Sequence, residues 1–205
     1  QNYKKKYVEF QKSLRLRNNA LKEINKKTFK IWNDLFIEKS LEISSLRNKH
    51  LDKIIPLLKN NFEKDFPAEK KVNFSVENLW LEEDDFENEL REVYQKDLEV
   101  KFSTVGPHRL DLLYDVNAVK SGDVLSRGEQ KLLILLTILG FNQHIHNLGN
   151  KHSILLVDDL PSELDEDNFL KCLDLILDAP GQKFVSSIDP DFLGIKGRFN
   201  TLIAL

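Results

Sequence analysis

An apolar run that ends in two acids restricts the fold of this chain more than any other feature. Residues 153–157 read Ser-Ile-Leu-Leu-Val, and Asp158 and Asp159 follow directly. A continuous apolar stretch of this length is typical of a strand buried in a parallel sheet. The two acids would then lie at the carboxyl end of the strand, where α/β proteins bind their ligands. Asp158 could hold Mg²⁺ and Asp159 could orient or deprotonate an attacking water, although a strand ending at a polar turn has the same pattern.

The segments around this run continue the α/β pattern. Apolar periodicity predicts helices over 132–139 and 167–177, and further strands over 182–186 and 200–205. Strand, helix and strand in this order predict a parallel sheet with right-handed crossovers. The strand over 182–186 ends at Ser186-Ser187, so we expect these hydroxyls at the same sheet edge as Asp158, although such residues are also common turn formers.

Two helix-start patterns flank the acidic run. Ser126 and Glu129 have the spacing of a capping box, which explains both residues without any ligand. A helix N-terminus with a Ser hydroxyl is also an anion site, and Gly128 would let the backbone approach a phosphate closely. Ser162 and Asp165 give a second helix-start signal after the acids.

The first 66 residues are expected to form a helical arm, and residues 67–205 a second domain. Apolar residues recur at spacings of three and four from Leu21 to Ile55, without a sustained heptad that would predict a long coiled coil. Residues 1–60 carry a net charge of +9, so the arm could bind a polyanion such as DNA, although a solvated outer face explains the same charge. The candidate DNA-binding residues are Lys4, Lys5, Lys6, Lys26, Lys27 and Lys30.

The middle of the chain is expected to contain short elements. Alternating apolar residues predict strands over 71–77, 99–104 and 110–116, an acidic helix over 84–97 and a turn at Gly106-Pro107. Arg109 could bind a phosphate bidentately or pair with Asp111.

Composition excludes several classes of protein. The single cysteine, Cys172, rules out an internal disulfide framework, and we expect it in the core on an apolar helix face. No apolar run approaches the roughly 18 residues needed to span a membrane, and no secretory signal is present. The chain begins at Gln1 and contains no Met, so we expect an excerpt of a longer, cytoplasmic protein.

Taken together, these motifs resemble those of ABC-type ATPases. Leu-Ser-Arg-Gly-Glu-Gln over 125–130 looks like the signature motif, Ile-Leu-Leu-Val-Asp-Asp over 154–159 like Walker B, and Ser-Glu-Leu-Asp over 162–165 like the D-loop. The Asp-Asp pair, this D-loop and Thr-Val-Gly-Pro-His-Arg over 104–109 are similar to the RecF recombination and repair proteins. Arg127 and Glu129 depart from the commonest signature, and Ser187 stands where many ABC proteins carry a switch histidine.

The resemblance implies an α/β fold: the C-terminal half of an ABC-type ATPase head with a parallel sheet, preceded by a helical arm. None of the eight glycines is followed by Lys, so the chain has no Walker A motif and is expected to be inactive alone. In the ABC family two heads close on ATP, so a second copy would use Ser126, Arg127, Gly128 and Glu129 in trans. Asp158 and Asp159 would act on Mg²⁺ and water in cis.

The same resemblance implies a function in recombinational DNA repair. The whole protein would be a slow ATPase that binds DNA, dimerises on ATP and assists recombinase loading at gapped DNA. Its partners would be single-strand/double-strand DNA junctions, a second copy of itself and recombination mediator proteins. The alternatives are another SMC-like ABC ATPase head, the nucleotide-binding subunit of a membrane transporter, and a non-catalytic interaction domain of the same fold.

Overall fold

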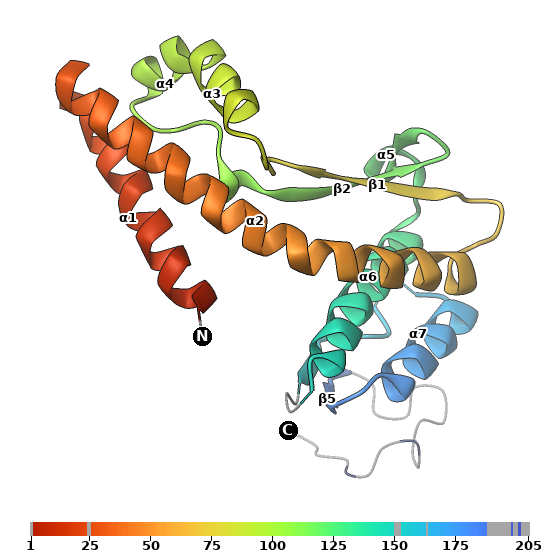
Figure 1. Ribbon diagram of the computed structural model, residues 1–205. Coiled ribbons are helices and arrows are strands. Elements are labelled where there is room, and N and C mark those ends of the chain that lie inside the picture. The colour runs from red at the N-terminus through yellow and green to blue at the C-terminus, as the bar shows by residue number, and fades with distance from the viewer. Residues whose placement is uncertain are drawn as a thin grey trace. The chain divides into compact units, whose positions relative to one another are not determined.

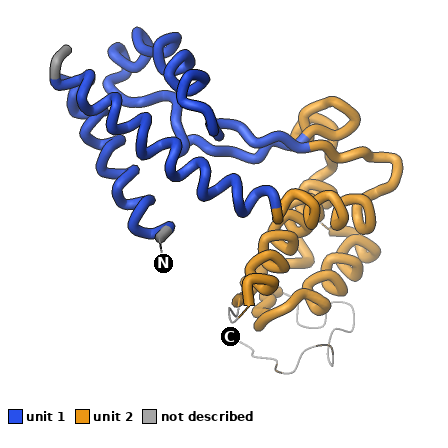
Figure 2. Tube along the Cα trace, in the orientation of Figure 1, with its two compact units in different colours: residues 1–52, 74–114 blue, residues 53–73, 115–205 orange. Residues whose placement is uncertain are grey.

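The computed structural model describes residues 2–23, 26–149, 153–162, 164–187, 198 and 201, without the side chains of residues 2, 26 and 27. The chain divides into two compact units (Figure 2). Unit 1 comprises residues 1–52 and 74–114, and unit 2 comprises residues 53–73 and 115–205. The division expected at residues 66 and 67 therefore falls inside unit 2.

Two long helices form the N-terminal arm, as the sequence predicted. α1 spans Asn2–Glu23 and α2 spans Lys26–Asp65 (Figure 1). Pro56 lies inside α2 without ending it, although a proline removes one backbone hydrogen bond from a helix. Leu58 and Phe62, on the turns that follow, are buried in unit 2, and this burial favours the continued helix.

Aromatic side chains build the core of unit 1. Phe10 of α1, Phe36 of α2 and Phe86 of α3 (Glu83–Glu92) are all completely buried. The ring centroids are 6.0 Å apart for Phe10 and Phe36, and 5.8 Å apart for Phe36 and Phe86. The Trp80 ring lies 4.6 Å from Phe86, at a distance typical of favourable aromatic pairs. The acidic helix α3 is therefore anchored by its apolar side, while Glu83, Asp84 and Asp85 on its first turn are exposed.

A buried ion pair adds a polar centre to this unit. The guanidinium of Arg17 in α1 donates to the carboxylate of Asp97 in α4 (Tyr94–Val100) at 2.8 Å, and both side chains are fully buried. Arg17 also donates to Asn33 and Ser103, and Asp97 accepts from the backbone N–H and the hydroxyl of Thr104. These bonds fix the segment after α4 against both arm helices.

The predicted strand over 99–104 is wrong. α4 continues to Val100, and Lys101 then takes a left-handed conformation with φ of 62°, which ends the helix. Ser103 and Thr104 satisfy their backbone N–H groups with side chains, those of Asn18 and Asp97, instead of with a neighbouring strand. The structure divides the predicted helix over 84–97 into two helices, α3 and α4, which are separated at Val93.

The Gly106-Pro107 turn is a short 3₁₀ helix, η1 (Pro107–Arg109). Gly106 has a φ of 142°, and a Cβ atom there would lie 2.8 Å from the Phe36 ring. Only glycine fits this position, because any side chain would collide with the aromatic core.

A small three-stranded sheet follows the order β1-β2-β3, with β1 at Val72–Glu77, β2 at Asp111–Val116 and β3 at Val119–Lys120. The first two strands confirm the predictions over 71–77 and 110–116. β2 and β3 are antiparallel, and Val116 faces Val119 across the ladder. The alternating burial along β1 confirms a half-buried strand.

Unit 2 contains the predicted parallel sheet. β4 (Ile154–Val157) pairs in parallel with β5 (Gln182–Val185), in a register that places Leu156 opposite Phe184. α7 (Glu166–Asp178) connects the two strands, and α5 (Ser121–Val124) and α6 (Arg127–Asn147) precede them. In Figure 1, α6 and α7 lie side by side.

Burial of β4 differs from the expectation of a strand covered on both faces. Leu155 is 8% exposed, whereas Ile154 and Leu156 on the opposite face are 61% and 73% exposed. The described residues therefore cover one face of the strand. The strand expected over 200–205 lies outside the described residues apart from Thr201.

A membrane-spanning segment is not found in the part of the chain that the structure describes, because each helix there is too short or too polar.

Candidate functional site

The two acids of the predicted Walker B run lie directly after β4, as expected. Asp158 is exposed and accepts a hydrogen bond from the Ser186 hydroxyl at 2.5 Å. The same hydroxyl oxygen accepts the backbone N–H of Asp159 at 2.9 Å. Because β4 and β5 are parallel and in register, the residue after each strand reaches the same edge of the sheet. The strand ends therefore hold the acid pair from two sides.

Ser186, not Ser187, makes these contacts. The sequence placed the switch position at Ser187 from the family resemblance, and both hydroxyls were expected at this edge. The parallel register explains the difference, since Val185 is opposite Val157 and the next residue on each strand is Ser186 and Asp158. Counting residues from the end of β5 identifies this contact once the pairing is known.

The backbone of Asp159 has an unusual conformation. Its φ of 46° lies in the left-handed region, which Asp and Asn enter more readily than most other residues. The carbonyl of Asp159 accepts a hydrogen bond from Lys131 at 2.9 Å. The peptide groups on both sides of this residue are thus fixed by other elements.

Lys131 is a functional candidate that the sequence did not reveal. Its ammonium group also donates to the carbonyls of Leu160 and Ser162, at 3.0 and 2.9 Å. Lys131 binds main-chain carbonyl oxygens, which every residue has, so no particular partner residue in the sequence indicates its role. The one available signal was its place on the first turns of a helix that starts at a candidate site.

The signature-like segment forms a complete capping box at the start of α6. The Ser126 hydroxyl accepts the backbone N–H of Glu129 at 3.3 Å, and the Glu129 carboxylate accepts the backbone N–H of Ser126 at 2.9 Å. The structural explanation of these two residues is therefore confirmed. The capping box is also compatible with anion binding, because Arg127 and Gly128 remain at the solvent-accessible N-terminus of a 21-residue helix.

Glu129 has a second partner. Lys70, in the segment between α2 and β1, donates to the Glu129 carboxylate at 2.5 Å. Partial burial acts to raise the pKa of Glu129, but the hydrogen bonds from Lys70 and Ser126 outweigh it and lower the pKa below its ordinary value. The Glu129 carboxylate is therefore ionised and charge-compensated within unit 2.

The D-loop-like residues have distinct roles. Asp165 is the N-cap of α7, and its carboxylate accepts the backbone N–H of Asn168 at 2.8 Å. Ser162 is exposed, and its carbonyl is one of the three that Lys131 binds. The helix-start signal thus belongs to Asp165, and Ser162 lies in the loop beside the acids.

A magnesium ion fits the carboxylate pair by its ligand chemistry. Mg²⁺ in phosphate sites is held by one or two carboxylates together with phosphate oxygens and water. Asp158 is exposed at the sheet edge, and adjacent ionised carboxylates repel each other in the absence of a cation. Among the described residues, no group of three or more His, Cys, Asp or Glu side chains is arranged as a metal site, so an all-protein metal cage is not indicated there.

The candidate DNA-binding lysines differ in their surroundings. Lys6 donates to Glu42 at 2.7 Å, and this bond raises the pKa of Lys6. Lys4, Lys5 and Lys30 are exposed, and the side chains of Lys26 and Lys27 lie outside the described residues. Residues 1–52 carry a net charge of +7 and residues 74–114 a net charge of −7, so unit 1 has no net charge. The positive charge of the arm is a local feature of a neutral unit.

The run over 104–109 belongs to unit 1. His108 contacts the Ser103 carbonyl through Nε2 at 3.1 Å, and burial lowers the pKa of His108. Asp111 accepts the backbone N–H of Leu112 at 2.8 Å, and Arg109 is exposed. These contacts stabilise the turn that follows α4.

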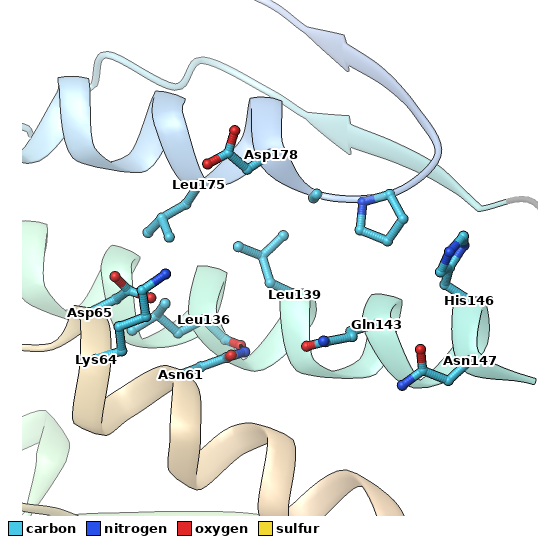
Figure 3. A pocket seen from close by; sticks show the side chains of 12 residues that line it. Asn61, Lys64, Asp65, Leu136, Leu139, Gln143, His146, Asn147, Leu175 and Asp178 are labelled. Carbon is cyan, nitrogen blue, oxygen red and sulfur yellow. Dashed lines mark hydrogen bonds between the residues drawn. The ribbon is translucent and has the colours of Figure 1, made fainter.

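A separate cavity of about 400 Å³ lies in unit 2 (Figure 3). Its walls come from the end of α2, the second half of α6 and the end of α7. Leu136, Leu139 and Leu175 form its apolar part, and Lys64, Asp65, His146 and Asp178 are its charged or titratable groups. None of the residues singled out from the sequence lines this cavity, and its mixed charges do not select one class of ligand.

The parallel strands, the capped helix and the acid pair at the sheet edge define an α/β unit with the fold of part of an ABC-type ATPase head. Comparison with known proteins narrows this class. No protein-family model matches the chain. The DNA replication and repair protein RecF of Shewanella sp. (strain MR-7) is 33% identical over 181 residues, which is 88% of this chain and 49% of the relative. RecF of Shewanella baltica (strain OS185) is 32% identical over 186 residues, or 90% of this chain and 51% of the relative.

Two solved structures have a fold similar to that of this chain. The recombination mediator protein RecF-ATPrS in the RecFOR pathway matches with a TM-score of 0.72 and 22% identity, over 93% of this chain and 54% of that chain. The RecF-ATP structure of the same pathway gives a TM-score of 0.71 and 21% identity, over the same shares of the two chains. The chain is therefore RecF-like in sequence and fold, and it spans about half the length of the curated relatives it matches.

Proposed function

We propose that this chain is the part of an ATP-dependent, DNA-binding recombinational repair protein that carries the signature motif, the Walker B acids and the D-loop. The observation that carries the proposal lies in unit 2, where a capped helix N-terminus at Ser126 and an acid pair after β4 occur together. This combination lies in a fold similar to that of solved RecF structures, whose descriptions include ATP. The names of the relatives, DNA replication and repair proteins, support the assignment to repair.

In this proposal the two acids have different tasks. Asp158, exposed at the sheet edge, would hold the Mg²⁺ that accompanies the nucleotide, and the cation would supply charge neutralisation there. Asp159 orients or deprotonates the attacking water. Ser186 holds both, since it donates to the Asp158 carboxylate and accepts from the Asp159 backbone.

The start of α6 acts in trans on the nucleotide of a second copy. Partial positive charge at a helix N-terminus and free backbone N–H groups attract phosphate. Ser126, Arg127 and Gly128 lie at this terminus, and Lys70 offsets the negative charge of Glu129 beside them. Two copies related by a two-fold axis would form two such composite sites, so ATP favours the dimer and hydrolysis favours its dissociation.

DNA binding is proposed for the arm, with Lys4, Lys5 and Lys30 as exposed cations. Contacts of this kind go to backbone phosphates, so binding would weaken steeply with salt and depend little on base sequence. The dimer would assist recombinase loading at gapped DNA together with recombination mediator proteins.

The trans role of α6 can be tested at Ser126 in the full-length protein by sedimentation with and without ATP and Mg²⁺. Asp and Asn are N-caps as good as Ser, so both substitutions keep the helix start. Ser126→Asp places a negative charge against phosphate and should abolish the ATP-dependent dimer, whereas Ser126→Asn should retain it.

Equal ATP-dependent dimerisation of Ser126→Asp, Ser126→Asn and the wild type would contradict the trans role of the signature. A wild type that binds ATP but stays monomeric would contradict the ATP-driven dimer itself. Melting curves of both variants, measured by circular dichroism, establish that the helix start has been kept.

A further inference from the structure

Lys131 connects the signature helix to the loop that carries the acids. It is the fifth residue of α6, which begins at Arg127 directly after the Ser126 cap. Its Nζ lies 2.9, 3.0 and 2.9 Å from the carbonyl oxygens of Asp159, Leu160 and Ser162. An ammonium group has three N–H donors, so these bonds use its full capacity. The Lys131 side chain therefore binds most of the segment that connects β4 to the D-loop.

A cation favours the convergence of these three carbonyls. The loop leaves regular structure after Val157, and its carbonyl oxygens lie outside any strand ladder or helix. Three carbonyl dipoles directed at one point repel each other, and a positive charge at that point makes the arrangement favourable. A side chain of the same length without the ammonium group would leave the three oxygens without this donor.

The acid pair is held from two independent elements. On one side, Ser186 after β5 accepts the Asp159 backbone N–H and donates to the Asp158 carboxylate. On the other side, Lys131 of α6 holds the Asp159 carbonyl. The left-handed φ of Asp159 lies between these two anchors, in a region where a non-glycine backbone needs support from its surroundings.

We propose that Lys131 is a positioning residue that sets the geometry of Asp158 and Asp159 for hydrolysis and couples it to α6, the helix capped by Ser126. This inference rests on the proposed ATPase function. Movement of α6 on engagement of a second copy would be transmitted to the acids through the three carbonyl bonds. Lys131 does not touch the nucleotide in this role, so its loss should change turnover far more than ATP affinity.

The experiment compares Lys131→Met, Lys131→Arg and the wild type in the full-length protein. Lys171→Met, on α7 of the same unit, is the matched control for loss of a helical lysine. Hydrogen exchange without nucleotide reports on the loop through three backbone N–H groups. Those of Leu160, Ser162 and Leu164 donate to the carbonyls of Ser186, Asp159 and Pro161, respectively. ATP affinity, kcat and KM are measured on the same samples.

We expect Lys131→Met to exchange the amides of Leu160, Ser162 and Leu164 at least about tenfold faster, because the loop opens more often without its anchor. ATP affinity should stay within about threefold, and kcat should fall by at least about tenfold with little change in KM. Lys131→Arg, which keeps charged donors, should recover part of both losses, and Lys171→Met should behave like the wild type.

Unchanged exchange in Lys131→Met would overturn the proposal, because the loop would then be held without this side chain. Faster exchange with an unchanged kcat would also overturn it, since the anchor would not position the acids. A wild type that hydrolyses no ATP would instead refute the proposed function, and the positioning role with it. The activity of the wild type thus separates the two failures.

Discussion

Removing the buried guanidinium of Arg17 should destabilise unit 1 strongly. Arg17→Met keeps the length of the side chain and its apolar packing near Phe29 and Phe36, whose ring centroids lie 5.4 and 5.3 Å from the guanidinium carbon. It removes the charge that faces Asp97 at 2.8 Å. The Asp97 carboxylate would remain fully buried, with only its two hydrogen bonds from Thr104.

The expected magnitude follows from this burial. Breaking a fully buried ion pair by removing one partner costs about 3–5 kcal/mol, because the remaining charge is neither solvated nor compensated. That is a factor of roughly 100 to several thousand in the unfolding equilibrium constant. Removing both charges in Arg17→Met/Asp97→Asn should cost clearly less than the sum of the single changes, since no uncompensated charge remains.

Urea unfolding followed by tryptophan fluorescence is the suitable assay. The chain has two tryptophans, Trp32 and Trp80, and both belong to unit 1. Glu42→Gln is the control, because the Lys6–Glu42 pair has a similar distance of 2.7 Å but is partly exposed. If Arg17→Met lowers the free energy of unfolding no more than Glu42→Gln does, the inferred role of the buried pair is refuted.

Two further predictions concern unit 2. Glu129→Gln keeps the capping box but removes the charge. Because the folded state lowers the pKa of Glu129, the stability lost in the variant should be largest near pH 7 and should vanish as pH falls below the ordinary value of 4.5. Thermal melts of the variant and the wild type between pH 3 and 7 measure this difference. A constant difference across this range would contradict the ionised pair with Lys70. Cys172 is fully buried, and burial raises its pKa to about 11. A thiol reagent at pH 8 should therefore modify it at least about 100-fold more slowly in the folded protein than in urea, and equal rates would show that the site is open.

Local signals in the sequence predicted the parts of the candidate site that depend on neighbouring residues. The run over 153–157 predicted β4 because a short apolar stretch bounded by acids has few alternatives in an α/β chain. Ser126 and Glu129 predicted their own hydrogen bonds because a capping box requires only three residues of separation. The parallel pairing of β4 with β5 followed from the order of the elements.

Contacts between distant residues were not predictable in this way. Arg17 and Asp97 are 80 residues apart in the sequence, and nothing in either segment identifies the other. Lys6 looked like a free cation of the arm, but its partner Glu42 lies on the next helix. The strand predicted over 99–104 failed because Lys101 takes a left-handed conformation that apolar alternation does not detect.

The left-handed backbone of Asp159 bears on how this acid should be replaced in an experiment. A glutamine or alanine there would remove the carboxylate and also place a residue less suited to a φ of 46° at that position. Asparagine enters this region about as readily as aspartate, so Asp159→Asn removes the charge while the backbone keeps its path. The same preference gives a physical reason for a short acid at this position: the choice between Asp and Glu is here a choice of main-chain conformation as well as of reach.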